Sequence, residues 1–213
     1  MTKISPSVLA SDLSNLASEV AEIATAGADM VHLDVMDGVF VTNMSFGMPI
    51  IESLRKKSDM VFDVHLMITK PEKYAKRFID AGADILTFHL EACEDSGALL
   101  DEIRANGAKS ALSIKPATPA EAVFPYLEKC DMILVMTVEP GYGGQSFMPD
   151  MLEKVRKIRA EIEKRGLDID IQVDGGLNPE TAKLAREAGA NVIVAGSSVF
   201  KAQDRRAAID ALR

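Results

Sequence analysis

The chain has 213 residues, of which 47% are apolar and 26% charged, as is ordinary for a globular protein in water. No apolar run approaches the ~18 residues of a membrane-spanning helix, and the net charge of −8 argues against nucleic acid or an anionic membrane as a partner. The N-terminus lacks the apolar core of a signal peptide, and Cys93 and Cys130 are too few for a disulfide framework. We therefore expect reduced thiols in a cytoplasmic protein.

One pattern recurs along the chain: an amphipathic stretch, then Ala-Gly-Ala with a polar residue, then a β-rich run. It occurs at Ala26–Asp29, Ala81–Asp84 and Ala188–Asn191, and in a looser form at Asn106–Lys109. Glycine directly after a helix is the usual left-handed cap. Each occurrence therefore indicates a junction from a helix to a strand.

The junctions and the sequence between them predict strands at residues 3–8, 30–35, 61–66, 85–90, 109–114, 132–137, 169–173 and 192–195. The predicted helices between the strands include residues 16–25, 49–57, 71–80, 151–165 and 179–187. Asn178 and Thr118 each place a capping side chain before a proline in the first turn of a helix. Strands that alternate with helices predict a parallel sheet covered on both faces.

Eight such units close naturally into a (β/α)8 barrel, the TIM-barrel architecture. An open doubly wound sheet is the alternative, but the Gly-x-Gly-x-x-Gly turn that would follow its first strand is missing. No linker, charge block or low-complexity segment divides the chain, so residues 1–213 are expected to form a single domain.

In such a barrel, the carboxyl ends of the strands form the floor of the active site. Two imidazoles and two carboxylates are predicted at those ends, from His32 and Asp34 on the second strand, His65 on the third and Asp174 on the seventh. This donor set suits one divalent cation: Zn²⁺, Fe²⁺, Mn²⁺ or Co²⁺. The alternative at the second strand is a hydrogen-bonded polar pair. Because the seventh strand lies across the barrel from the second, Asp34 and Asp174 are expected to approach a flat substrate from opposite faces.

A second set of residues follows the last three predicted strands and is rich in glycine. Glycine lets the backbone approach an anion and turn its N–H groups toward it. The loops after the last strands are also the usual phosphate position in barrels. Plain turns are the alternative for each segment alone, but together the segments predict a phosphate site. Its residues are Gly141, Gly143, Gly144, Gly175, Gly176, Gly196 and Ser197.

Five further residues near the strand ends leave two interpretations open. Met36, Met67 and Met136 are either core filler or an apolar lining that keeps water from a reactive anion. His89 is either a hydrogen-bonded core histidine or a contact to ligand or substrate. Lys115 is either a solvated or salt-bridged side chain at the rim or a substrate contact.

The chain closely resembles the ribulose-phosphate 3-epimerase family from Ile4 to about Leu212. The resemblance is carried by Ser5-Pro6-Ser7, His32–Val41 with Asn43, His65-Leu66-Met67, Met136–Gly141, Gly143-Gly144-Gln145, Val173–Gly176 and Ala195-Gly196-Ser197. Two positions depart from it. Where the family usually has Val-Pro-Asn, this chain has Val41-Thr42-Asn43, so the loop after the second strand lacks a rigid proline. Ala117 stands where glycine is common.

The resemblance implies a ribulose-phosphate-binding barrel that interconverts D-ribulose 5-phosphate and D-xylulose 5-phosphate. It implies one divalent metal ion held by His32, Asp34, His65 and Asp174, with Asp34 and Asp174 also acting as acid and base. The substrate, a small phosphorylated ketose, would be bound by Ser7, by His65 and Asp174, and by the glycine turns. The resemblance further implies a homo-oligomer that works in the pentose phosphate pathway or in carbon fixation.

Three other functions compete with this one. An allulose 6-phosphate 3-epimerase would carry the same ligands, although Gly143-Gly144 and the loop after the second strand favour the pentose. A sugar-phosphate binding protein without catalysis would not need the complete acid/base set. A metal-free decarboxylase would carry an Asp-x-Lys-x-x-Asp segment after a strand, and this sequence has none.

Overall fold

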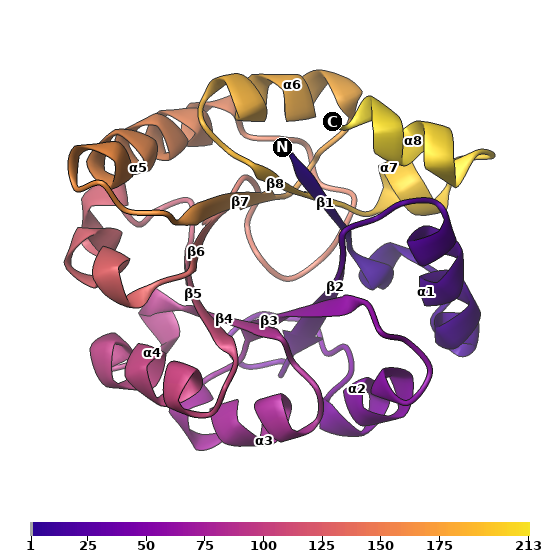
Figure 1. The fold of residues 1–213 in the computed structure, drawn as a ribbon, viewed down its shortest axis with the longest axis horizontal. Coiled ribbons are helices and arrows are strands. Elements are labelled where there is room, and N and C mark those ends of the chain that lie inside the picture. The colour runs from indigo at the N-terminus through magenta and orange to yellow at the C-terminus, as the bar shows by residue number, and fades with distance from the viewer. Residues whose placement is uncertain (1) are drawn as a thin grey trace.

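The computed structural model describes residues 2–213. Eight parallel strands form one sheet in the order β1-β8-β7-β6-β5-β4-β3-β2. A parallel bridge between Ser7 and His32 brings the two ends of this order together. In Figure 1 the strands surround the centre of the molecule and the helices lie outside them. The predicted (β/α)8 barrel is confirmed.

The elements alternate along the chain as the sequence indicates. The strands are β1 (Lys3–Pro6), β2 (Met30–Met36), β3 (Val61–Met67), β4 (Ile85–His89), β5 (Lys109–Ile114), β6 (Met132–Met136), β7 (Asp170–Asp174) and β8 (Val192–Ala195). The α-helices are α1 (Leu16–Thr25), α2 (Met48–Arg55), α3 (Ala75–Asp80), α4 (Ser96–Ala105), α5 (Leu152–Lys164), α6 (Pro179–Glu187), α7 (Ser197–Phe200) and α8 (Arg205–Ala211). Short 3-10 helices are η1 (Val8–Ala10), η2 (Leu13–Asn15), η3 (Pro71–Lys73), η4 (Leu90–Ala92), η5 (Ala120–Lys129) and η6 (Pro149–Met151). No helix of the described residues is both long enough and apolar enough to cross a membrane.

Six of the eight predicted strands end one or two residues from the predicted position, and two of these changes matter for the site. β1 stops at Pro6, because the side chain of Ser7 accepts a hydrogen bond from the amide of Leu9 and starts η1. β2 continues to Met36, so His32 lies in the middle of the strand rather than at its end. The imidazole of His32 is therefore deep inside the barrel, where no part of it is exposed.

Two predicted helices also change in kind. Residues 71–80 divide into η3 and α3. The segment after Pro119 is a 3-10 helix with Pro125 inside it, and proline removes the N–H that an α-helix would need there. Thr118 does not cap this helix, since its hydroxyl donates a hydrogen bond to Glu91 instead. The predicted cap at Asn178 is confirmed, as a capping box with Thr181.

The interior of the barrel changes character from one end to the other. Its amino-terminal end is filled by apolar side chains from five strands: Met30, Ile85, Ala111, Met132 and Val192. Successive residues of a strand point to opposite faces, so Met30, His32 and Asp34 all point inward from β2. The barrel axis therefore runs from an apolar plug to a buried polar cluster.

At the amino-terminal end, the polar residue of the repeated junction has a shared role. Asp29, Asp84 and Asn191 each accept a hydrogen bond of 2.7 Å from an amide at the start of the strand before them, at Ile4, Phe62 and Ile171 respectively. Asp131, outside the repeat, does the same for Ser110 at 2.9 Å, and Lys109 of the looser repeat does not. Each of these side chains joins an odd-numbered strand to the start of the next one.

We expect these four side-chain hydrogen bonds at the amino-terminal end of the barrel, called here the brace, to contribute to stability and not to chemistry. Replacing Asp84 by alanine leaves the amide of Phe62 without its acceptor and should lower the free energy of unfolding by about 1–3 kcal/mol. Urea unfolding followed by circular dichroism measures this. Asp80→Ala is the control, because Asp80 makes only an exposed pair with Lys76 and its loss should cost less than about 1 kcal/mol. Equal effects of the two substitutions would contradict the role of the brace.

Candidate metal centre and active site

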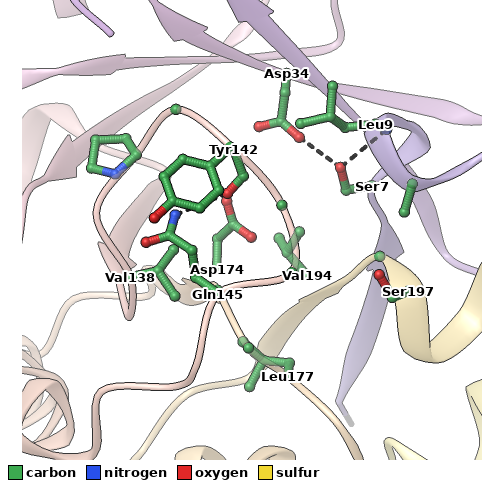
Figure 2. A pocket seen from close by; sticks show the side chains of 18 of the residues that line it. Ser7, Leu9, Asp34, Val138, Tyr142, Gln145, Asp174, Leu177, Val194 and Ser197 are labelled. Carbon is green, nitrogen blue, oxygen red and sulfur yellow. Dashed lines mark hydrogen bonds between the residues drawn. The ribbon is translucent and has the colours of Figure 1, made fainter. Parts of the chain in front are cut away.

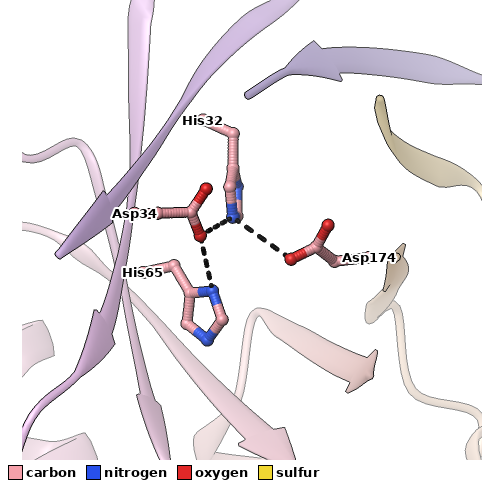
Figure 3. A group of neighbouring side chains, drawn as sticks. All are labelled: His32, Asp34, His65 and Asp174. Atoms are coloured by element: carbon pink, nitrogen blue, oxygen red, sulfur yellow. Dashed lines mark hydrogen bonds and ion pairs between the residues drawn. The ribbon is translucent and has the colours of Figure 1, made fainter. Parts of the chain in front are cut away.

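Four side chains that the sequence singles out converge inside the barrel. One ligand atom from each of His32, Asp34, His65 and Asp174 lies within 4.8 Å of the others. Asp34 Oδ1 is 3.3 Å from His32 Nε2 and 3.2 Å from His65 Nδ1, and Asp174 Oδ2 is 3.9 Å from His32 Nε2. In Figure 3 the two carboxylates approach the ring of His32 from opposite sides.

This group fits a metal ion. His32 Nε2 is buried, faces both carboxylates and has no hydrogen-bond partner among the described residues. A buried polar atom without a partner is costly, and two imidazoles with two carboxylates are a donor set that borderline divalent cations accept. The group could therefore hold one such ion.

The strands explain why these residues meet. The register of β2 with β3 sets Asp34 directly beside His65. Asp174 comes from the last position of β7, which β8 and β1 separate from β2. Closure of the barrel brings β7 and β2 to face each other across its interior, and so assembles ligands that lie about 140 residues apart in the chain.

Charge in the cluster is unevenly distributed. Burial, with the charge of Asp34 as the second cause, raises the pKa of Asp174 to about 6. Burial also acts to raise the pKa of Asp34. The charge of His32 and the hydrogen bonds that Asp34 makes with His32 and His65 outweigh burial and hold the pKa of Asp34 well below its usual value. Burial acts to lower the pKa of His32, but the carboxylates of Asp63 and Asp34 raise it well above normal. The carboxylates around His32 thus favour a positive charge in the place where a bound cation would supply one.

Sequence reasoning missed a fifth member of the cluster, Asp63. It is fully buried, and its Oδ2 lies 2.7 Å from His32 Nδ1. The same oxygen accepts hydrogen bonds from Ser5 Oγ at 2.9 Å and Gln172 Nε2 at 2.5 Å. A carboxylate behind a histidine ligand orients the ring and raises its basicity. The alternation of side chains along β3 could have revealed Asp63, because Asp63 lies two residues before His65 and therefore points to the same face of the strand.

The structure decides between the two interpretations of His89 and places Lys115 beside an aromatic ring. His89 is fully buried, its Nε2 lies 2.9 Å from His65 Nε2, and burial lowers its pKa to about 4. It is the hydrogen-bonded core histidine of the first interpretation. Lys115 Nζ lies 3.7 Å from the centre of the Phe40 ring, whose own centre is 4.9 Å from that of His89. Neither residue lines the pocket described next.

A pocket of about 630 Å³ opens above the cluster. Figure 2 shows Asp34, Ser7 and Asp174 around it, with Ser7 Oγ donating a hydrogen bond of 2.6 Å to Asp34 Oδ2. His32 and His65 lie below the floor and are fully buried. The predicted site residues that line the pocket are Ser7, Asp34, Met36, Met67, Met136, Gly141, Gly143, Gly144, Asp174, Gly175, Gly176, Gly196 and Ser197.

The pocket also has lining residues that sequence reasoning missed. Tyr142 is 57% exposed on the loop after β6, and Lys201 brings a cationic side chain to the lining. Leu9, Leu177 and Val194 add apolar surface. Val194 lies on β8 and Leu9 on η1, whereas Tyr142 and Leu177 reach the pocket through the folding of loops, which no local pattern in the sequence predicts.

The glycines after β7 allow a close approach of two loops. Gly176 has a φ of +70°, and a Cβ there would lie 2.5 Å from the amide nitrogen of Phe147. Gly175 has a φ of +122° and would place a Cβ 2.5 Å from Val138. Both conformations favour glycine. Close packing alone accounts for these two glycines, so the phosphate role of the glycine turns stays a prediction.

Comparison with known proteins places the chain in a family. The family model described as the ribulose-phosphate 3 epimerase family matches residues 3–200. The chain belongs to the ribulose-phosphate 3-epimerase family. A rice protein (Oryza sativa subsp. japonica) named as the cytoplasmic isoform of ribulose-phosphate 3-epimerase is 48% identical over 99% of this chain and 92% of its own length. A ribulose-phosphate 3-epimerase of Bacillus subtilis is 42% identical over 100% of this chain and 99% of its own length.

The fold is also shared with a solved structure of low sequence identity. A 3-hexulose-6-phosphate synthase superposes with a TM-score of 0.70 at 20% identity, and covers 99% of this chain and 97% of the other. At this identity the likeness shows the fold alone. Membership of the epimerase family therefore rests on the sequence relatives.

We expect Asp63 to support metal binding through His32. Asp63→Asn replaces the carboxylate that accepts three hydrogen bonds by a neutral amide, and should weaken metal affinity about 10- to 100-fold. Competition of Zn²⁺ with a chelator measures the affinity. Asp59→Asn is the control, because Asp59 is exposed. Equal Zn²⁺ affinity of the two variants would contradict this role.

Proposed function

We propose that this protein is a metal-dependent ribulose-phosphate 3-epimerase that interconverts D-ribulose 5-phosphate and D-xylulose 5-phosphate. One observation carries the proposal: two histidines and two aspartates converge at the floor of a pocket, in a chain of this family. Relatives that are 42–48% identical over almost the whole chain carry the name of this enzyme.

The reaction requires a proton to leave carbon 3 on one face of the sugar and another to arrive on the opposite face. Figure 3 shows the carboxylates of Asp34 and Asp174 on opposite sides of the His32 ring, which supports one carboxylate on each face of the sugar. One carboxylate takes the proton and the other carboxylic acid returns one, and the two exchange roles when the direction reverses. Ser7 steadies Asp34, since its hydroxyl donates a hydrogen bond to Asp34 Oδ2.

His32, Asp34, His65 and Asp174 would hold the divalent ion. When bound, the ion acts as a Lewis acid that spreads the negative charge of the enediolate intermediate. The nearly buried side chains of Met36, Met67 and Met136 line the pocket around it. Their apolar surface would keep water from the intermediate.

The other end of the pocket suits the phosphate of the substrate. The glycine turns after β6 and β7 and the start of α7 line the pocket there. Their backbone N–H groups would bind the phosphate and hold the ketose still while the proton moves. Because the net charge of −8 repels an anion, this local attraction has to act at short range.

Two further features belong to the proposal. A cytoplasmic location agrees with the two free cysteines, of which Cys130 has its pKa raised by burial to about 12 and is therefore an unreactive thiol. A homo-oligomer is expected from the family resemblance. Light scattering of the purified protein measures its mass.

The two aspartates should be essential for proton transfer. Asp34→Asn and Asp174→Asn should each slow the exchange of the carbon-3 proton with solvent by about 10²- to 10⁴-fold, because each removes one acid/base group. Exchange is followed by NMR in deuterated water. Phosphate affinity should change little, since the glycine turns are untouched, and Asp59→Asn should behave as wild type. Near-normal exchange in either active-site variant would refute the two-base scheme.

Removal of the metal should abolish turnover. We expect gently purified protein to contain a divalent ion, to lose activity on chelation and to regain it when Zn²⁺, Fe²⁺, Mn²⁺ or Co²⁺ is added. Metal analysis and a coupled epimerase assay measure this. The same assay with D-allulose 6-phosphate tests the substrate, and a higher kcat/KM for the six-carbon sugar would overturn the assignment to the pentose. Full activity without any metal would contradict the proposed centre.

A further inference from the structure

The two ring nitrogens of His65 have different partners. Nδ1 faces the candidate metal site, 3.2 Å from Asp34 Oδ1. Nε2 points the other way, 2.9 Å from Nε2 of His89. Both imidazoles are fully buried. Two imidazole nitrogens at this distance can share only one hydrogen, so one donates and the other accepts.

A metal ion bound at Nδ1 of His65 determines where the hydrogens lie. The metal takes the lone pair of Nδ1, so the hydrogen of a neutral His65 is on Nε2 and is donated to His89. Nε2 of His89 then accepts, which leaves the hydrogen of His89 on its Nδ1. That atom faces Oε2 of Glu91 at 3.4 Å, and it has no well-aligned hydrogen-bond partner among the described residues. An ionised carboxylate only accepts, so Glu91 favours this arrangement.

Glu91 is held in place through its other oxygen. Oε1 accepts a hydrogen bond of 2.8 Å from the amide of Lys115 and another from the hydroxyl of Thr118. The segment that carries these donors is fastened by Lys154, whose Nζ donates to the carbonyls of Lys115, Pro116 and Thr118. Both donors act on Oε1, so Oε2 is the oxygen turned toward His89.

We propose that His89 and Glu91 are positioning residues that set the tautomer of His65, so that its Nδ1 presents a lone pair to the metal ion. The inference rests on the metal site of the proposed function. Most metal-binding histidines donate their second N–H to a carboxylate, a carbonyl or water. In this protein His89 lies between His65 and the carboxylate of Glu91. Because Glu91 favours a hydrogen on Nδ1 of His89, Nε2 of His89 accepts the hydrogen bond from His65.

This arrangement makes Glu91→Gln a sharper test than removal of the side chain. The donors at Lys115 and Thr118 would bind the carbonyl oxygen of the new amide and turn its NH₂ group toward His89. Nδ1 of His89 would then accept, its Nε2 would carry the hydrogen, and His65 would have to accept at Nε2. The hydrogen of His65 would move to Nδ1, where it opposes metal binding.

The test compares the Zn²⁺ affinity of the full chain by competition with a chelator. Glu91→Gln should bind Zn²⁺ about 10- to 100-fold more weakly than wild type. Glu94→Gln is the matched control, because it makes the same chemical change at an exposed position of the same loop and should leave the affinity unchanged. His89→Leu should weaken binding, whereas His89→Gln, which keeps an acceptor near the position of Nε2, should restore most of it.

A spectroscopic measurement on the wild-type protein needs no variant. Long-range ¹H–¹⁵N correlation distinguishes the two neutral tautomers of histidine, and the chain has only 3 histidines to assign. The spectrum is recorded with Zn²⁺ bound, because without an ion the carboxylate of Asp34 competes for a hydrogen on Nδ1 of His65. We expect His89 to carry its hydrogen on Nδ1.

The outcomes separate this inference from the proposed function. If His89 carries its hydrogen on Nε2 in the Zn²⁺-loaded protein, or if Glu91→Gln binds Zn²⁺ as tightly as Glu94→Gln, the inference is wrong and the metal site stands. If wild type itself binds no Zn²⁺, Fe²⁺, Mn²⁺ or Co²⁺, the metal site of the proposed function fails, and the inference fails with it.

Discussion

Charged and polar groups meet inside the barrel at a place where water does not reach. Asp63 contacts Nδ1 of His32, whereas Asp34 and Asp174 both lie near its Nε2, and His32 is fully buried. Burying such groups is costly unless each finds a partner of opposite charge or a hydrogen bond. The carboxylates around His32 meet this requirement in part. Nε2 of His32 has no hydrogen-bond partner in the part of the chain that the structure describes, and a bound cation would supply a partner. The rest of the candidate site surrounds this group of charges.

The amino-terminal end of the barrel contributes to stability, and the carboxyl-terminal end holds the candidate site. At the amino-terminal end, carboxylate and amide side chains join neighbouring strands, and an apolar layer fills the interior. At the carboxyl-terminal end, the strands carry the candidate metal ligands and the loops carry glycines. The barrel can bury polar side chains at one end, at a cost in free energy, because the apolar side chains at the other end pack closely and stabilise the fold.

The surroundings of the cluster extend further than the ligands. Glu91 follows β4 and Lys115 follows β5, yet both belong to the chain of contacts that reaches His65 through His89. Lys154, on α5, fastens the same segment by its hydrogen bonds to three carbonyls. The candidate metal-binding nitrogen of His65 is therefore linked, through His89, to loop residues that do not line the pocket.

The order of the elements could be predicted from local patterns, because the repeated helix-to-strand junction and the alternation along strands are properties of neighbouring residues. The ranges of α1, α6, β5 and β8 follow from them to the residue. Asp34, His65 and Asp174 could also be grouped, since the carboxyl ends of barrel strands meet at one place, and His32 precedes Asp34 by two residues on the same face of β2. At Thr118 the local rule failed because of a distant residue, since its hydroxyl contacts Glu91 instead of capping a helix.

What the sequence by itself determined is thus the alternation of strands and helices, the barrel they imply and the residue types that favour a metal and a phosphate. Only the tertiary structure decided that Asp63 stands behind His32, that His89 contacts His65 and that the ligand atoms lie within 4.8 Å of one another. The reason is physical. Strand alternation gives the face of the sheet to which a side chain points, but barrel closure and loop packing decide which side chains on that face come within hydrogen-bonding distance.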